Sequence, residues 1–125
     1  MTIPTMKRIF TLIPALLISL CLATVANAES VYYTLEFKIK GGQTEAFLEL
    51  MEVATVDTRN FEGFEHLAIL VDENDSETVF FYEIWESEED HAAYRKWRSD
   101  TDFGSKIQPF LAGPPTRKVY TLFQE

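Results

Sequence analysis

An apolar segment that passes directly into a capped helix sets the middle of this fold. We predict the segment as a strand over 78–85; it contains VFFYEIW and is apolar on both faces apart from Glu83, as expected of a strand that is covered on both sides. Ser87 then takes the position of an N-cap, with Asp90 three residues later, and acidic side chains fill the first turn, where the helix dipole favours them. The helix that follows should therefore begin at Glu88.

This second helix carries an aromatic stripe. At 100° per residue, Ala93, Tyr94 and Trp97 share one face of the helix, and His91 lies on the edge of that face. Such a stripe is either ordinary core or one wall of an aromatic pocket. The spacing alone leaves both readings open.

The remaining elements follow from the periodicity of apolar residues, which has a period of two in strands and about 3.6 in helices. We expect a strand over 32–39, a helix over 43–58, a strand over 64–71 and a strand over 117–123, with a turn over 109–115. The resulting order β-α-β-β-α-β is that of a ferredoxin-like α+β fold, with a four-stranded antiparallel sheet and two helices on one face.

Two helices can cover only one face of such a sheet. The other face would leave the apolar central strand exposed, and a large exposed apolar patch marks an interface. The sequence therefore predicts a homodimer whose sheets pack face to face.

The first 28 residues have the features of a cleavable signal peptide. Lys7 and Arg8 precede an apolar run over 9–23, and a small-x-small cleavage site lies at 26–28. The run is shorter and more interrupted than a membrane span, so we expect no stable membrane anchor. The mature protein should be one domain over 29–125, exported to the periplasm or secreted.

Composition excludes several classes of function. Cys21 lies in the leader, so the mature domain has no thiol, disulfide or cysteine metal ligand. The net charge is −9 for the whole chain, which argues against nucleic acid as a partner. His66 and His91 are the only histidines and have no ligand spacing, and the glycines at 41–42 lack a phosphate-loop motif. We therefore predict no metal site.

Three aromatic residues are candidates for binding a flat ligand between the second helix and the sheet. The hydroxyl of Tyr94 needs a partner when it is buried, and a phenolic ligand would supply one. Trp85 could close one end of a pocket, and Trp97 could stack on a ring, although core packing is the more common role of such residues.

Three residues are candidates for moving a proton. His91 could serve as a base with a pKa near neutrality, unless it is only a solvated helix edge. Glu36 and Glu83 lie on strands, where burial would raise the carboxyl pKa. Each of these carboxylates could instead pair with one of three cations, Lys38, Arg59 or Lys118.

Local features along residues 31–123 occur together in one known family. They are the glycine after the first strand, the loop from Thr58-Arg59 to Gly63-Phe64, the strand end at Trp85-Glu-Ser87, and the turn Leu111-Ala-Gly-Pro-Pro115. In these features the chain resembles the antibiotic biosynthesis monooxygenase (ABM) domain, a dimeric α+β barrel. The resemblance implies oxygenation of a quinol or polycyclic phenol by O2 with no cofactor.

A haem-degrading branch of the same superfamily uses an Asn, a Trp and a His ligand. These fall by spacing at Thr34, Tyr94 and Gly104, so none of the three is kept. The resemblance thus disfavours haem degradation, and Thr34 remains a candidate for contact with a substrate.

Our hypothesis from the sequence is a cofactor-independent monooxygenase that binds a small aromatic substrate and O2. The candidate catalytic residues are His91, Tyr94 and Glu83, and the candidate substrate-binding residues are Trp85, Trp97, Thr34 and Glu36. The alternative is a non-catalytic dimer that binds a small aromatic molecule, haem or another porphyrin.

Overall fold

The computed structural model describes residues 28–125, together with residue 2. The predicted signal peptide, including Cys21, lies outside the described residues apart from positions 2 and 28. Within the described part of the chain, no helix is both long and apolar enough to cross a membrane.

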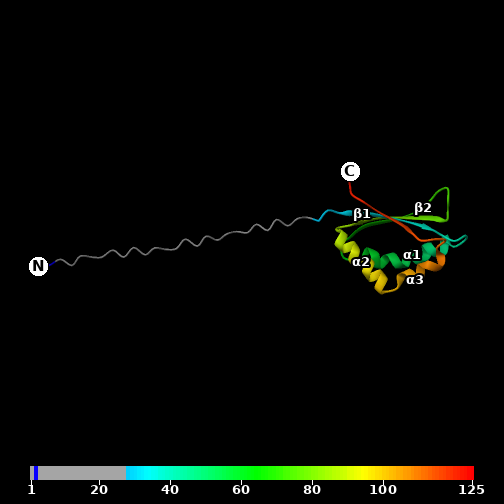
Figure 1. Cartoon of the computed structure of the whole chain (residues 1–125), viewed down its shortest axis with the longest axis horizontal. Helices are drawn as coiled ribbons and strands as arrows, with labels where there is room; N and C mark the ends of the chain where they lie inside the picture. Colours follow the sequence, from blue (N-terminus) through cyan, green and yellow to red (C-terminus); the bar gives the residue numbers. More distant parts are fainter. Residues whose placement is uncertain (1, 3–27) are drawn as a thin grey trace.

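The described chain is an α+β fold with one sheet. Its elements in order are β1 (Val31–Lys38), α1 (Thr44–Arg59), β2 (Phe64–Val71), β3 (Thr78–Trp85), α2 (Glu88–Asp100), α3 (Phe103–Ile107), the 3-10 helix η1 (Gln108–Phe110) and β4 (Thr116–Tyr120). The strands are antiparallel in the order β2-β3-β1-β4, and the helices lie on one face (Figure 1). The predicted ferredoxin-like fold is confirmed.

The core lies between α1 and the strands β1, β2 and β3. Strand residues that point toward the helices alternate with residues that point away from them, and the apolar side chains of the helix-facing set are buried. The core cluster consists of Phe37, Ile39, Phe47, Met51, Leu67, Val79 and Phe81. The central position of β3 explains why its sequence is apolar on both faces.

The start of α2 depends on a side-chain cap. Ser87 has an extended backbone, its hydroxyl oxygen accepts a hydrogen bond from the Asp90 amide at 3.1 Å, and its hydroxyl donates to the Asp90 carboxylate at 2.7 Å. This confirms the predicted start at Glu88. Gly63 lies against this cap, because its carbonyl accepts a hydrogen bond from the Glu86 amide at 2.8 Å.

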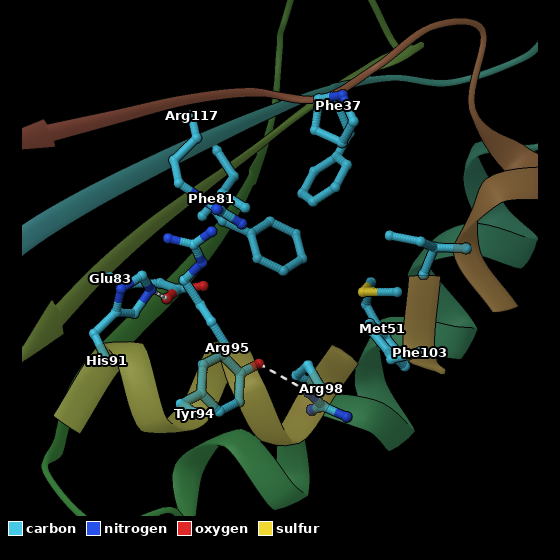
Figure 2. A pocket seen from close by; sticks show the side chains of 13 residues that line it. Phe37, Met51, Phe81, Glu83, His91, Tyr94, Arg95, Arg98, Phe103 and Arg117 are labelled. Carbon is cyan, nitrogen blue, oxygen red and sulfur yellow. Dashed lines mark hydrogen bonds and ion pairs between the residues drawn. The ribbon is translucent and has the colours of Figure 1, made fainter. Parts of the chain in front are cut away.

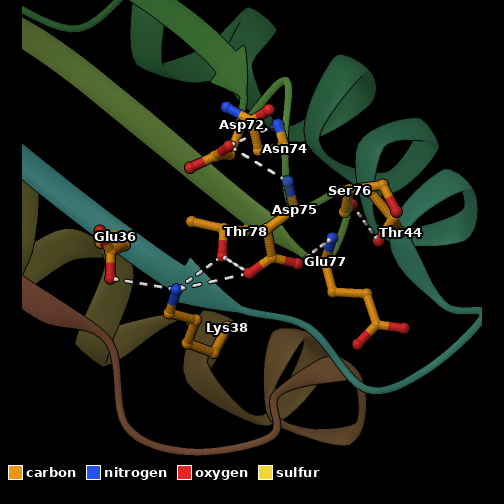
Figure 3. Close-up of polar contacts among 9 residues, drawn as sticks. All are labelled: Glu36, Lys38, Thr44, Asp72, Asn74, Asp75, Ser76, Glu77 and Thr78. Atoms are coloured by element: carbon orange, nitrogen blue, oxygen red, sulfur yellow. Dashed lines mark hydrogen bonds and ion pairs between the residues drawn. The ribbon is translucent and has the colours of Figure 1, made fainter.

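The turn between β2 and β3 is held by acidic side chains (Figure 3). Asp72 accepts hydrogen bonds from the amides of Asn74 and Asp75, and Thr78 donates to Asp75 at 2.6 Å. Lys38 donates to Thr78 at 2.6 Å. These bonds fix the hairpin and join it to the end of β1.

Strand β2 contains a bulge near its start. Phe64 is paired with Trp85 and His66 with Ile84, so one extra residue, Glu65, stands between the two pairs. The extra residue lets Phe64 and Leu67 lie on the same, helix-facing side although three positions separate them.

Two segments differ from the sequence prediction. Residues 103–110 form α3 and η1 where only a turn over 109–115 was expected; Phe103, Ile107 and Phe110 pack on the core, which stabilises a helix too short to form by itself. Strand β4 ends at Tyr120 rather than at residue 123.

The face of the sheet opposite the helices is apolar at its centre and uncovered by any helix of the described chain (Figure 1). The register places its side chains in cross-strand rows. The rows from β1, β3 and β2 are Tyr32–Ile84–His66, Thr34–Tyr82–Ala68 and Glu36–Phe80–Leu70.

Glycine 63 gives a test of the contact between the α2 cap and the preceding loop. Its φ is +80°, and a Cβ added there would overlap the side chain of Asp90. We expect Gly63→Ala to lower the free energy of unfolding by about 2–4 kcal/mol, through left-handed strain and steric overlap.

Gly42→Ala is the matched control, because Gly42 has a φ of +76° but nothing near its Cβ position. It should cost only the strain, about 1 kcal/mol. Urea unfolding measures both values, and equal losses in the two variants would contradict the role of the Asp90 contact.

Candidate functional site

A cavity of about 390 Å³ lies between the sheet and the helices α2 and α3 (Figure 2). Its volume falls in the range of small-molecule sites. Phe37, Met51 and Phe103 lie toward one end, and Glu83, His91, Arg95 and Arg117 lie toward the other, so the cavity has an apolar end and a polar end. The lining residues are Leu35, Phe37, Met51, Phe81, Glu83, His91, Tyr94, Arg95, Arg98, Phe103, Ile107, Pro115 and Arg117.

Glu83 is a buried carboxylate at the polar end. It lies on the helix-facing side of β3, and 6% of its side chain is exposed. One carboxylate oxygen accepts a hydrogen bond from Trp85 Nε1 at 3.0 Å and lies 3.8 Å from His91 Nε2. Burial raises the pKa of Glu83, while the bond from Trp85 and the charge of Arg117 act in the opposite direction. A carboxylate of this kind is a stronger base than an exposed one.

His91 is buried, with 2% of the residue exposed, so the reading of a solvated edge is wrong. Its ring stacks on Tyr33 at a centroid distance of 3.6 Å. Burial, followed by the charges of Arg117 and Arg95, lowers the pKa of His91 to about 4. The expected pKa near neutrality is therefore wrong as well, and the imidazole is neutral at pH 7.

Tyr94 lines the cavity with its ring, but the protein already satisfies its hydroxyl. The hydroxyl oxygen lies 2.9 Å from Thr58 Oγ1 and accepts a hydrogen bond from Arg98 Nε at 3.0 Å. Arg98 also donates to Thr58 and to the carbonyl of Ala54. A ligand is therefore not needed as a partner for this hydroxyl, and the network holds the Tyr94 ring in place.

The four predicted substrate-binding residues do not line the cavity. Trp85 is completely buried beneath it and fixes the Glu83 carboxylate through its N–H. Trp97 packs against Phe61 at a centroid distance of 5.6 Å. Thr34 and Glu36 lie on the opposite face of the sheet, where Glu36 pairs with Lys38 at 3.6 Å.

Three arginines that the sequence analysis did not single out contribute to the cavity. Arg95 and Arg98 follow His91 by four and seven positions, which is the spacing of one helical face, whereas Ala93 is exposed. Arg117 is paired in register with Leu35, whose side chain lines the same cavity. Helical spacing measured from His91 could have found Arg95 and Arg98, whereas Arg117 is found only from the register of β4 against β1.

Metal ligands do not gather at this site. Among residues that the structure describes, no group of three or more His, Cys, Asp or Glu side chains could hold a metal ion.

The lowered pKa of His91 predicts a loss of stability in acid. Below pH 6.5 the unfolded chain binds a proton at this histidine, and the folded chain does not do so until about pH 4. Over that window, wild type should therefore lose about 2–3 kcal/mol of unfolding free energy relative to His91→Phe, which cannot titrate.

Urea unfolding at several pH values measures this difference between the two proteins. His66→Phe is the control, because it removes the histidine on the opposite, exposed face of the sheet. A wild-type stability that runs parallel to that of His91→Phe from pH 6.5 to 4 would contradict the buried, neutral imidazole.

Comparison with known proteins gives the family. The sequence profile of the antibiotic biosynthesis monooxygenase family matches residues 30–103, which is more than half of the chain. No curated protein sequence matches the chain significantly.

Solved structures share the fold at low identity. SnoaB of Streptomyces nogalater, a cofactor-independent oxygenase, is 11% identical with a TM-score of 0.69, and the match covers 78% of this chain and 97% of that one. A proposed antibiotic biosynthesis monooxygenase of Nitrosomonas europaea is 20% identical with a TM-score of 0.65, over 75% and 99% of the two chains. Rv0793 of Mycobacterium tuberculosis is 14% identical with a TM-score of 0.69, over 78% and 98%. At these identities the likeness shows the fold, while the profile match shows that the chain belongs to the antibiotic biosynthesis monooxygenase family.

Proposed function

We propose that this protein is a cofactor-independent monooxygenase that oxidises a quinol or polycyclic phenol with O2 in the cavity between the sheet and α2. The observation that carries the proposal is the Glu83 carboxylate, which is buried, raised in pKa and directed into a cavity with apolar walls. Family membership and the fold shared with SnoaB, a cofactor-independent oxygenase, support it.

The first step of the proposed reaction is proton transfer from the substrate to Glu83. Glu83 accepts the phenolic proton of the substrate, and the resulting phenolate is electron-rich enough to reduce O2 directly. One oxygen atom enters the product and the other leaves as water. The substrate supplies all four electrons that reduce the two oxygen atoms, and a quinol thereby becomes a hydroxyquinone. The apolar end of the cavity holds the rings away from water, and the arginines stabilise the negative charge that develops.

Two neighbours prepare Glu83 for this role. The N–H of Trp85 fixes one carboxylate oxygen at 3.0 Å. His91 stays neutral at the working pH because its pKa is about 4, so it does not neutralise the carboxylate by forming a permanent ion pair. Glu83 is therefore the proton acceptor in this scheme, and His91 is a positioning residue.

Oxygen uptake tests the proposal. We expect saturable O2 consumption with naphthoquinols or anthrones, in the presence of chelator and a superoxide scavenger that suppress autoxidation. Glu83→Gln should lower kcat by about 10²–10⁴-fold, the usual contribution of a general base.

Glu86→Gln is the matched control, because this nearby carboxylate is exposed beyond the end of β3. Its activity should equal that of wild type. If the quinols bind but O2 uptake never exceeds the rate in buffer alone, the oxygenase proposal is wrong and the protein is a non-catalytic binding protein.

We also propose that the uncovered face of the sheet joins two copies of the chain. Phe80, Tyr82 and Ile84 give this face an apolar centre, and Leu70 beside them is 51% exposed. Pairing two such faces would bury the apolar rows of both sheets.

Tyr82→Asp should convert the dimer to a monomer in sedimentation experiments, because it places a charge in the middle of the joined faces. Val53→Asp is the control: Val53 is 72% exposed on α1, away from the sheet face, and its replacement should leave the dimer intact. A wild-type monomer at micromolar concentration would contradict the face-to-face pairing.

Export of the mature domain over 29–125, to the periplasm or outside the cell, is our proposal for its location. It is supported by the basic start, apolar run and cleavage site in the first 28 residues.

A further inference from the structure

Two guanidinium groups at the polar end of the cavity have no partner in the described chain. Figure 2 shows Arg95 extending from α2 and Arg117 extending from β4 toward the same space beside Glu83. Within residues 28–125, neither forms a salt bridge or donates a side-chain hydrogen bond. Arg98 differs from both, because the protein engages its guanidinium at Ala54, Thr58 and Tyr94.

The two unpartnered groups repel one another. Partial burial of the Arg117 guanidinium lowers its pKa, and the charge of Arg95 lowers it further. Arginine remains charged despite such a shift. Two like charges held close together are costly, and the charge of Glu83 offsets only part of this repulsion. An anion between the two guanidinium groups would therefore be stabilised.

The charge at this end is also not balanced by Glu83. One carboxylate faces two unpartnered guanidinium groups, which leaves a local excess of one positive charge. A single further negative charge would complete the balance. The chain as a whole carries a net charge of −9, but charges beyond about 8–10 Å are screened at physiological salt, so the local arginines decide what enters.

We propose that the ligand of this cavity is a flat aromatic ring system that carries a carboxylate, with Arg95 and Arg117 binding the carboxylate. The inference rests on the proposed function and narrows its substrate class from phenols in general to acidic phenols. A guanidinium fork matches a carboxylate with two parallel hydrogen bonds, and both residues are solvent-exposed as well as cavity-lining, which places them where the cavity meets the solvent.

The shape of the cavity agrees with such a two-ended ligand. Rings would lie against Phe37, Phe81 and Phe103 at the apolar end, and the carboxylate would stay at the mouth. Glu83 lies beside the two arginines at the polar end and would face the ring hydroxyl nearest to the carboxylate. Binding of the ligand carboxylate by the arginines would thus orient the ring and determine which hydroxyl faces Glu83.

Binding of two matched probes tests this inference. They are 1,4-dihydroxy-2-naphthoate and the corresponding 2-carboxamide, which has nearly the same size and shape but no charge. Titration calorimetry of the purified protein without oxygen should show the acid binding at least about tenfold more tightly, as expected for charge-assisted hydrogen bonds. The preference should shrink as salt is raised.

Substitutions of the two arginines test whether they cause the preference for the acid over the amide. Arg95→Gln and Arg117→Gln should each reduce the acid-over-amide ratio about tenfold or abolish it. Lys96→Gln is the control, because it removes the same charge from the neighbouring position of α2, where Lys96 is exposed and pairs with Asp100 at 2.6 Å. It should leave the ratio unchanged. Equal affinity of wild type for acid and amide would overturn the inference, whether or not the variants fold.

Oxygen uptake with the same two probes separates this inference from the proposed function. If both quinols are oxidised but the acid has no advantage in binding or in kcat/KM, the oxygenase stands and the acidic substrate class is wrong. If the acid binds preferentially and neither probe is oxidised, the anion site stands and the oxygenase is wrong.

Discussion

The guanidinium of Arg98 joins the two long helices above the sheet. It donates to the carbonyl of Ala54 at 2.7 Å and to Thr58 at 2.9 Å, both on α1, while it extends from α2. The same group packs against Phe103 at 4.3 Å from the ring centroid. One side chain therefore connects α1, α2 and α3 above the sheet. Hydrogen bonds to a charged group are about twice as strong as neutral ones, so the single side chain of Arg98 can hold the helices together.

The buried carboxylate is stable only because its surroundings are organised in layers. Trp85 lies beneath it and donates its N–H, the neutral ring of His91 lies beside it, and the arginines stand toward the solvent. Removing a charge from water costs several kcal/mol unless hydrogen bonds and opposite charges offset the loss. The strength of Glu83 as a base and the depressed pKa of His91 therefore share one cause, the low-polarity space between β3 and α2.

Much of the fold follows from the sequence, and the site follows only in part. Strands, the Ser87 cap and the helix on 44–59 were predictable because each depends on residues within one turn or one strand. The short α3 was not, since packing of Phe103 and Ile107 holds it. The burial of His91 was also beyond local reasoning, because it depends on the Tyr33 ring from a strand nearly 60 positions away. The sequence does not predict the arginines as cavity residues, because arginine is usually solvated. Only the register of β4 shows that Arg117 faces inward.

The position of Arg117 on β4 would link the proposed ligand site to the least supported strand. This strand is five residues long, is exposed along its whole length and pairs only with β1. Edge segments of this kind open before the rest of a domain. A ligand bound by Arg117 would stabilise the pairing of β4 with β1. By the same coupling free energy, fraying of β4 would lower the affinity for the ligand. The rate of amide hydrogen exchange in β4 would therefore fall as the fraction of protein with bound ligand rises.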